Sequence, residues 1–600
     1  MPVSAGKLKI KKTDHPVKKR QLVNRSGSRG AIVRFNAELT GFVMRHVFSL
    51  PVIGLAAVLS GCGGSDDSGV FIPTYHATAP TYSIGGNIAG LSGTIVLQDN
   101  GGDNLSVSSN GPFAFGVTLQ PSSAYSVTIA TQPANQVCSV KNGSGTATAA
   151  VTNIAVVCSL SAGTTDVWTW VDGADFVNAP GVYGTQGTAA AGNTPGARRQ
   201  PVAWTDAAGN FWLFGGNSAG NVAMLNDLWE YSPTAGLWAW QGGAAVTGAA
   251  ASYGSLGAPA AGNNPGAREG SASWTDAAGN LWLFGGDNLA AQNWQEFNDL
   301  WSYSPTTGLW TWVGGANTAA GAGSYGTAGV PAVGNLPPAR TDAITWVDSA
   351  GVFWLFGGAQ LKSDGSYLAV FNDLWSYNPT TGLWTWVGGS ATPNAAGVYG
   401  TQGSAAAGNV PGARMGGGAW LDGSGNVWLF GGLGLGSGGL TQEYSDLWEY
   451  SPVSGQWTWI GGSDGANAAG VYGTERAGAA GNNPGARVSA VSWKDLSGNF
   501  WLFGGYGYGQ SGAAGDLNDL WEYNFGSGVW TWIGGSSSIT APANYGIQGA
   551  PSVSNTPGAR EQAVGWADSS GKFWLFGGFG SDSSGVEDDL NDLWSFTQSP

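Results

Sequence analysis

Phe211-Trp-Leu-Phe-Gly-Gly216, followed by Asn226-Asp-Leu-Trp229, is the stretch that decides the fold of this chain. Variants of the two segments return five more times, and the tryptophan that ends the second segment recurs every 72 to 74 residues. These tryptophans are Trp229, Trp301, Trp375, Trp448, Trp521 and Trp594. A supersecondary unit repeated at a fixed period is typical of a repeat fold. The C-terminal three quarters of the 600 residues therefore consists of one unit repeated six times.

Each unit contains four short runs with the composition of β-strands. In the second unit these runs cover residues 270–274, 281–284, 299–303 and 309–313. Residues that favour turns, such as Gly, Asn, Pro and Ser, separate the first run from the second and the third from the fourth. Four strands per unit at a fixed period predict the blade of a β-propeller.

The two ends of the repeat predict how the ring closes. The sixth unit stops at 594–596 and lacks the Trp-x-Trp strand of the others, while an unpaired Trp168-Thr-Trp170 stands ahead of the first unit. We expect this N-terminal strand to complete the last blade, because closure removes open sheet edges that promote aggregation. The predicted fold is all-β, with a six-bladed propeller over residues 166–600 that follows a small β-sandwich.

The unit resembles the kelch repeat, whose marks are a double glycine at the end of the second strand and an aromatic pair further along. Double glycines stand at 215-216, 285-286, 357-358, 431-432, 504-505 and 577-578. The resemblance covers residues 166–597 and implies a kelch-type propeller similar to the central domain of galactose oxidase. The units are longer than the usual kelch length of about 50 residues. The excess lies mostly between blades, as at 174–197.

The first 61 residues have the composition of an export signal. A short basic start leads into an apolar run, too short to span a bilayer, and then into Leu59-Ser-Gly-Cys62. This ending resembles the bacterial lipobox, which implies lipidation of Cys62 and an anchor in the outer membrane, on its periplasmic or cell-surface face. The alternative is an ordinary cleaved signal with an incidental cysteine. Met44 begins a compact signal by itself, so we expect the true start there, with a functional basic arm over residues 1–43 as the alternative. We expect residues 62–82 to form a flexible tether.

The distribution of charge excludes one class of partner. Eleven of the 23 Lys and Arg lie before residue 46, so removal of residues 1–61 leaves 12 basic and 36 acidic side chains. The formal net charge then changes from -15 to about -24. A surface this acidic repels nucleic-acid phosphates and anionic lipid headgroups. We therefore expect no nucleic-acid partner.

Residues 83–160 alternate apolar and polar side chains in short runs bounded by Gly, Asn and Pro. This pattern predicts a small antiparallel β-sandwich of roughly seven strands. Cys138 and Cys158 lie in two of the last runs, and such a pair in an exported protein is expected to form a disulfide. The domain resembles the immunoglobulin-like or carboxypeptidase-regulatory-like modules of bacterial surface lipoproteins, which implies a spacer. No residue cluster supports the alternative of a ligand site.

Tryptophan is concentrated in the repeats. Five positions per unit account for all but one of the 31 tryptophans, and we expect these to pack between blades, each burying about 150–250 Å². Trp294 alone falls outside the register, in the loop between the second and third strands of its unit. It is a candidate stacking platform for a sugar or a peptide, with an ordinary loop anchor as the alternative.

One arginine and one aspartate recur in every unit, and we expect these twelve residues to be structural, through ion pairing and turn capping. The arginines are Arg198, Arg268, Arg340, Arg414, Arg487 and Arg560. The aspartates are Asp227, Asp299, Asp373, Asp446, Asp519 and Asp592. Function is expected instead where the copies differ.

The residues directly after the recurrent arginine differ between units. They are Arg199-Gln200, Glu269, Thr341-Asp342, Met415, Val488 and Glu561-Gln562. At the start of a channel-lining strand, one cation, three carboxylates and amides predict a polar pocket at the propeller mouth. The alternative is a set of solvated channel residues. The candidate ligand-binding residues are therefore Arg199, Gln200, Glu269, Trp294, Asp342, Glu561 and Gln562.

The repeats lack several common catalytic groups. All three histidines, at 15, 46 and 76, precede the β domains, and the repeats contain no cysteine. An imidazole base, a Ser-His-Asp arrangement and a histidine metal site are therefore excluded. The copper site of galactose oxidase, which needs His, Tyr and Cys, is excluded for the same reason. We predict no catalytic residue, no metal and no cofactor.

These observations favour a non-enzymatic binding protein, anchored to the membrane through Cys62, whose propeller loops bind a protein or a glycan. The alternative is a sugar mutarotase or other carbohydrate-active enzyme. It would use Glu269, Asp342, Glu561 and Arg199 as acid, base and anion-binding groups, and similarity to six-bladed kelch mutarotases of sialic acid implies that such chemistry needs no metal or histidine. A third hypothesis is a structural role in the envelope matrix.

Overall fold

The computed structural model describes residues 80–89, 91, 94–133, 136–160, 166–218, 223–290, 293–436 and 440–598. These residues form 41 strands and, within the described ranges, no helix. No helix of the described part could cross a membrane. The expected leader 1–61, the start at Met44, the anchor at Cys62 and nearly all of the tether 62–82 lie outside the described residues.

The first domain is a sandwich of two four-stranded sheets. Its strands are β1 (Ile84–Ala89), β2 (Ile95–Asp99), β3 (Asp103–Val107), β4 (Gly111–Ala114), β5 (Ala124–Thr131), β6 (Gln136–Lys141), β7 (Ser144–Thr146) and β8 (Val151–Leu160). The sheet orders are β4-β1-β8-β6 and β3-β2-β5-β7. Apolar side chains of both sheets, such as Ile84, Leu97 and Val156, form one buried core.

The sandwich differs from the expected one in two ways. It has eight strands rather than seven, because 144–146 adds the short edge strand β7 beside β5. Its first and last strands, β1 and β8, pair in parallel, whereas we expected antiparallel pairing throughout. Parallel neighbours need a long crossover connection, and here the six intervening strands of the domain supply it.

The predicted disulfide is confirmed. Cys138 and Cys158 lie directly opposite each other on β6 and β8 and are bonded. Both cysteines are buried within the sandwich core. The bond therefore joins the last two long strands of the domain.

Replacing both cysteines by serine is expected to lower the free energy of unfolding of the sandwich by about 3 kcal/mol, because a bond across 20 residues restricts the unfolded chain. Limited proteolysis of residues 84–160 in denaturant would measure the loss. Tryptophan fluorescence provides an internal control, because all 31 tryptophans lie after residue 167 and should report unchanged unfolding. Equal protease resistance of the sandwich with and without the two cysteines would contradict this prediction.

The rest of the described chain forms six antiparallel sheets of four or five strands, and three two-stranded hairpins accompany them. The first contains β10 (Arg198–Arg199), β11 (Val202–Thr205), β12 (Phe211–Ser218), β13 (Ala223–Ser232) and β14 (Leu237–Gly242). The second contains β15 (Ala272–Thr275), β16 (Leu281–Phe284), β19 (Leu300–Ser304) and β20 (Leu309–Gly314), with the hairpin β17 (Asp287–Ala290) and β18 (Asn293–Glu296). The third contains β21 (Ile344–Val347), β22 (Phe353–Phe356), β25 (Leu374–Asn378) and β26 (Leu383–Gly388), with the hairpin β23 (Ala359–Leu361) and β24 (Tyr367–Val370).

The last three sheets repeat this plan. The fourth contains β27 (Gly418–Leu421), β28 (Val427–Phe430), β31 (Leu447–Ser451) and β32 (Gln456–Gly461), with the hairpin β29 (Leu433–Leu435) and β30 (Thr441–Glu443). The fifth contains β33 (Arg487–Val488), β34 (Val491–Lys494), β35 (Phe500–Tyr508), β36 (Ala514–Asn524) and β37 (Val529–Gly534). The sixth contains β38 (Arg560–Glu561), β39 (Val564–Ala567), β40 (Phe573–Ser581), β41 (Glu587–Thr597) and β9 (Val167–Asp172).

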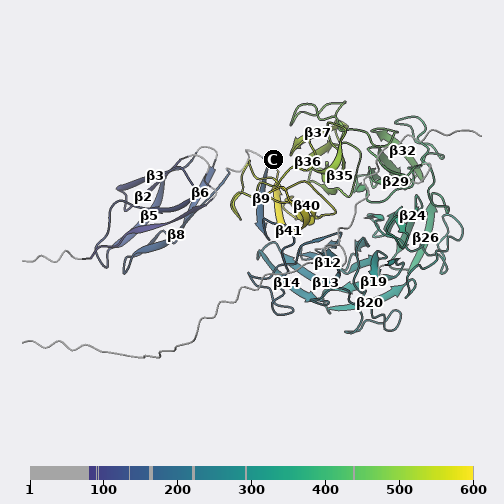
Figure 1. Cartoon of the computed structure of the whole chain (residues 1–600), viewed down its shortest axis with the longest axis horizontal. Helices are drawn as coiled ribbons and strands as arrows, with labels where there is room; N and C mark the ends of the chain where they lie inside the picture. Colours follow the sequence, from purple (N-terminus) through teal and green to yellow (C-terminus); the bar gives the residue numbers. More distant parts are fainter. Residues whose placement is uncertain are drawn as a thin grey trace, which may run out of the picture. The chain divides into compact units, whose positions relative to one another are not determined.

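The sheets follow one another around a common centre, from β12 and β13 in teal to β40 and β41 in yellow (Figure 1). The inner strands β11, β15, β21, β27, β34 and β39 contact one another in that order, and β39 contacts β11. The sixth sheet takes its fourth strand from the N-terminal side, because β9 pairs with β41 and sets Trp170 opposite Trp594, as predicted. Repeated antiparallel sheets in this order are consistent with a β-propeller.

A ring of backbone hydrogen bonds joins the six sheets at the centre. One residue of each sheet donates its N–H to the carbonyl of the equivalent residue in the preceding sheet, at 2.8 to 3.2 Å, and Gln200 of the first sheet closes the ring by donating to Gln562 of the sixth. All six have a positive φ of 51 to 64°. We call these residues the neck ring: Gln200, Gly270, Asp342, Gly416, Ser489 and Gln562.

Aromatic side chains fill the spaces between neighbouring sheets, as predicted. Trp274 of the second sheet stacks on Phe353 of the third with ring centroids 5.3 Å apart, and its indole N–H donates to the carbonyl of Trp354 at 3.0 Å. Each tryptophan of the Asn-Asp-Leu-Trp segments is completely buried. The hydrophobic core of this part of the protein therefore lies between neighbouring sheets.

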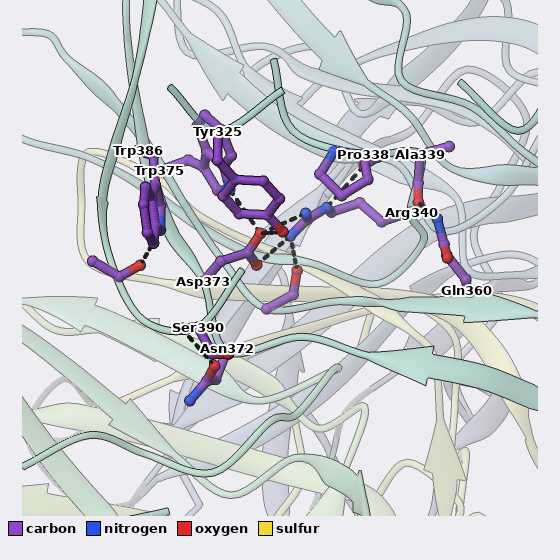
Figure 2. Close-up of polar contacts among 12 residues, drawn as sticks. Tyr325, Pro338, Ala339, Arg340, Gln360, Asn372, Asp373, Trp375, Trp386 and Ser390 are labelled. Atoms are coloured by element: carbon purple, nitrogen blue, oxygen red, sulfur yellow. Dashed lines mark hydrogen bonds and ion pairs between the residues drawn. The ribbon is translucent and has the colours of Figure 1, made fainter. Parts of the chain in front are cut away.

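The recurrent arginines and aspartates are buried ion pairs, as predicted. In the third sheet, Arg340 Nη1 and Nη2 donate to Asp373 Oδ1 and Oδ2 at 2.7 and 2.8 Å (Figure 2). The Tyr325 hydroxyl and the Trp375 indole N–H both donate to Oδ2 at 2.8 Å. The other pairs are Arg198–Asp227, Arg268–Asp299, Arg414–Asp446, Arg487–Asp519 and Arg560–Asp592. These twelve residues stabilise the sheets, so a functional site is expected at the positions that vary between repeats.

Candidate functional site

The variable residues after the recurrent arginines lie beside the second strand of their own sheets. Arg199 is opposite Asn217, Glu269 is opposite Asp287, and Glu561 is opposite Phe579. Their cross-strand partners immediately follow the double glycines, both of which have positive φ in every sheet. Glycine permits this conformation and bends the second strand, so that the next side chain faces the variable residue.

Five carboxyl groups interact electrostatically with one another, and three of them also interact with Arg199. We call Glu269, Asp287, Asp342, Glu561 and Asp589 the carboxylate cluster. Arg199 is within electrostatic range of Glu269, Glu561 and Asp589, and its Nη1 lies 3.8 Å from Asp589 Oδ1. Asp342 interacts with Glu269, Asp287 and Glu561. The structure thus brings together four of the predicted residues, Arg199, Glu269, Asp342 and Glu561.

Burial makes these carboxyl groups hard to ionise. It raises the pKa of Glu269 to about 8, against the attraction of Arg199 and with repulsion from Asp342 and Asp589. It also raises the pKa of Glu561 to about 7, and those of Asp342 and Asp589 to about 6. The pKa of Asp287 is raised by burial and then by the neighbouring Glu269. Near neutral pH the cluster can therefore hold and release protons.

Several oxygens of this region are buried and accept no hydrogen bond. They are Asn217 Oδ1, Glu269 Oε2, Asp287 Oδ1 and both carboxyl oxygens of Asp589. The Asn217 side chain is only 1% exposed, and its Nδ2 lies 3.5 Å from Glu269 Oε1. A buried acceptor without a donor is costly in a part of the protein that serves only stability. These atoms are therefore the strongest indication of a site.

The variable positions that predicted a polar pocket carry polar side chains on one side only. Met415 and Val488, which occupy the equivalent variable positions in the fourth and fifth sheets, are buried in an apolar cluster with Leu433 and Val370. Tyr367 packs against this cluster and is also within electrostatic range of Asp342. The variable positions of the fourth and fifth sheets thus belong to a buried apolar cluster, which we call the apolar wall.

Three of the predicted residues belong to the neck ring. Gln200 Nε2 donates to both carboxyl oxygens of Asp342, at 2.9 and 3.0 Å, so the two side chains hold each other across Gly270. Gln562 donates its backbone N–H to Ser489. Gln200, Asp342 and Gln562 line a cavity of about 180 Å³. They shape the centre of the ring of sheets.

Trp294 lies in a loop contact. It is opposite Leu289 in the β17–β18 hairpin and is half-buried. A Cβ atom added to Gly365, in the loop between β23 and β24, would lie 2.8 Å from the indole nitrogen. The indole therefore packs against the loop of the next sheet, which supports the loop-anchor interpretation.

Sequence reasoning missed Asn217, Asp287, Phe579 and Asp589. The first three, together with Tyr506, follow the double glycines, where the six copies read Asn, Asp, Ala, Leu, Tyr and Phe. That variation was a usable signal, because the rule that function lies where the copies differ applies to this position too. Asp589 carries a weaker signal, since its partnership with Arg199 depends on the closure of the sixth sheet against the first.

A larger cavity of about 720 Å³ lies between the fifth and sixth sheets, lined by Asp166, Arg476, Glu522 and Lys572 among others. Arg476 donates to the Asp166 carboxylate across it. Burial raises the pKa of Glu522 to about 7, with repulsion from Asp495 and Asp166. Two basic side chains offset two of the three acidic ones in this cavity, whereas the carboxylate cluster has one cation for five carboxyl groups and remains the better candidate site.

The stability of the protein is expected to fall as the pH rises from 5 to 8. The pKa of Glu269 lies near 8 in the folded protein and near its ordinary 4.5 in the unfolded chain, so the folded state binds more protons between these values. Glu269→Gln should reduce the slope by up to about 1.4 kcal/mol per pH unit. Urea unfolding at pH 5, 6.5 and 8 measures the slope, and the exposed Asp464→Asn should leave it unchanged. Identical pH profiles for the wild type and Glu269→Gln would contradict the prediction.

Among the described residues, no group of three or more His, Cys, Asp or Glu has an arrangement that could hold a metal ion. Comparison with known proteins found no matching family and no matching curated protein.

Proposed function

We propose that this chain is a kelch-type, six-bladed β-propeller of a bacterial envelope lipoprotein, which binds a protein or glycan partner without catalysing a reaction. The anchor would be Cys62, at the outer membrane, and the sandwich would act as a spacer. The six sheets, their double glycines and the closed neck ring support the kelch-type propeller. The export-signal composition of residues 1–61 supports the location.

The carboxylate cluster is the observation that carries the binding function. The twelve recurrent charges form ion pairs in which one atom, Arg268 Nε, lacks a hydrogen-bond partner, whereas the variable region leaves several buried acceptors without donors. Unsatisfied acceptors beside an apolar wall are typical of a ligand site, because a ligand can supply the missing donors. The surroundings of Glu269 therefore favour binding over a purely structural role in the envelope matrix.

The test is a binding screen with the mature protein, residues 62–600. Glycan arrays and envelope protein extracts would be probed with the wild type and with Glu269→Gln/Glu561→Gln. Asp464→Asn serves as the matched control, because it removes an exposed carboxylate. We expect at least one ligand at micromolar concentration, with weaker binding by the double variant only. The proposal fails if nothing binds, or if both variants bind like the wild type.

A carbohydrate-active enzyme is the second candidate, favoured by the pKa values near 7 and 8 of Glu561 and Glu269. Two carboxyl groups that exchange protons at neutral pH can act as general acid and general base, and Arg199 can hold an anionic group of a sugar. Such a mutarotase would protonate the ring oxygen and deprotonate the anomeric hydroxyl. Anomer exchange across a panel of sugars tests this, and a rate unchanged by Glu269→Gln/Glu561→Gln would exclude it.

A further inference from the structure

Aromatic rings stand beside the carboxylate cluster. Phe579 lies opposite Glu561 on neighbouring strands and is half-buried. Tyr506, on β35 of the fifth sheet, is 36% exposed, and its phenol is within electrostatic range of Glu561. Tyr367, which packs against the apolar cluster, is also within electrostatic range of Glu561. Glu561 thus has Phe579 as its cross-strand neighbour and two tyrosines of other sheets within electrostatic range.

One of these rings, that of Phe579, already contacts a cation. The Arg199 guanidinium carbon lies 5.5 Å from the centroid of the Phe579 ring, within the range of a cation–π contact. Arg199 is the cation that interacts with Glu269, Glu561 and Asp589 at once. A single guanidinium cannot neutralise five carboxylates, so the cluster has an excess of negative charge whenever it is ionised.

The buried acceptors indicate what is missing. Asn217 provides evidence independent of the acidic residues, because its amide oxygen is buried, lacks a donor and belongs to a side chain that reaches Glu269. When Glu269 and Asp287 are ionised, their Oε2 and Oδ1 atoms and the Asn217 oxygen offer acceptors only. A group that satisfies them must carry several N–H donors, and a positive charge would also balance the carboxylates.

The apolar wall defines the rest of the ligand. Met415, Val488, Leu433 and Val370 belong to one buried apolar cluster, and the partly buried Tyr367 packs against it. Such side chains favour hydrocarbon over a polyhydroxylated sugar.

We infer that the site formed by Glu561, Glu269 and Asn217, with the rings of Tyr506, Phe579 and Tyr367, binds an organic ammonium group carried on a hydrocarbon chain. This inference rests on the proposed binding function and names its ligand chemistry. The carboxylates and the Asn217 amide would accept the N–H donors, the aromatic faces would contact the cation, and the apolar wall would receive the chain. A free alkylamine and a lysine side chain share this chemistry.

Isothermal titration of the mature protein with n-hexylammonium, n-hexanol and hexanoate tests the inference. We expect binding of the ammonium alone, weakened by added salt, because only this probe carries both the positive charge and the donors. Glu561→Gln should weaken it about tenfold or more, whereas Asp464→Asn should not change it. Tyr506→Phe keeps the ring and should retain binding, whereas Tyr506→Ala should weaken it.

Further probes separate the two sources of the ammonium group and the two proposals. Stronger binding of Nα-acetyl-lysine methylamide than of n-hexylammonium would identify a lysine side chain of a partner protein, and the reverse would identify a free amine. Equal affinity for n-hexylammonium and n-hexanol, or unchanged affinity in Glu561→Gln, would overturn the inference. A glycan or protein ligand without any ammonium binding would overturn it while leaving the proposed function intact. Absence of every ligand would overturn both.

Discussion

Asp373→Ala is expected to lower the free energy of unfolding by about 3–5 kcal/mol, because it leaves a buried arginine without its counter-ion. Asp373 is completely buried and accepts four hydrogen bonds, two from Arg340 and one each from Tyr325 and Trp375 (Figure 2). The substitution removes the acceptor of all four donors at once. The positive charge then remains in a place that water does not reach.

Denaturant unfolding monitored by tryptophan fluorescence measures this loss. Asp464→Ala is the matched control, because it removes an exposed carboxylate and should leave the midpoint unchanged. The double variant Arg340→Met/Asp373→Leu should lose less stability than Asp373→Ala, because no unpaired charge remains buried. A loss below about 1 kcal/mol for Asp373→Ala would contradict the role of the Arg340–Asp373 ion pair in stabilising the sheet.

Trp168→Ala is expected to cost about 3–5 kcal/mol through the closure of the sixth sheet. Trp168 is buried in an aromatic cluster, with ring centroids 5.3 Å from Phe503 and 4.9 Å from Phe596. It joins the fifth and sixth sheets at the point where the first strand of the ring meets the last. The substitution leaves a large cavity there and weakens the pairing of β9 with β41.

The matched control is Trp294→Ala, which removes a tryptophan that is half-buried in a loop contact. We expect it to cost on the order of 1 kcal/mol. Hydrogen exchange provides a second measurement, because amides of β9 and β41 should lose protection in Trp168→Ala and keep it in Trp294→Ala. Equal losses of stability in the two variants would contradict a special role for β9.

The repeated frame could be predicted from the sequence because every part of it occurs six times. Fixed spacing identified the ion pair of Arg340 and Asp373 as structural before any contact was known. The missing Trp-x-Trp strand of the sixth unit and the unpaired one at 168–170 predicted the closure. The packing of Trp274 against the next sheet followed from the same periodicity.

The candidate site could be predicted only in part, because it depends on which side chains meet across strands and sheets. Glu269 and Glu561 were found from their variable position, but their burial and raised pKa values depend on neighbours in other units. Asp589 reaches Arg199 only through the closed ring. The sequence does not mark Asn217 as a site residue, and it became a candidate because its buried side-chain oxygen accepts no hydrogen bond.

The pairing of β9 with β41 also sets an order of events during synthesis. Asn555, 387 residues after Trp168, donates a hydrogen bond to the carbonyl of Trp168. A ribosome that adds about 5–20 residues each second needs roughly 20–80 seconds to bridge this distance. During that interval β9 has no strand to pair with, because β41 has not yet been synthesised. The ring can therefore close only after β41 has been synthesised.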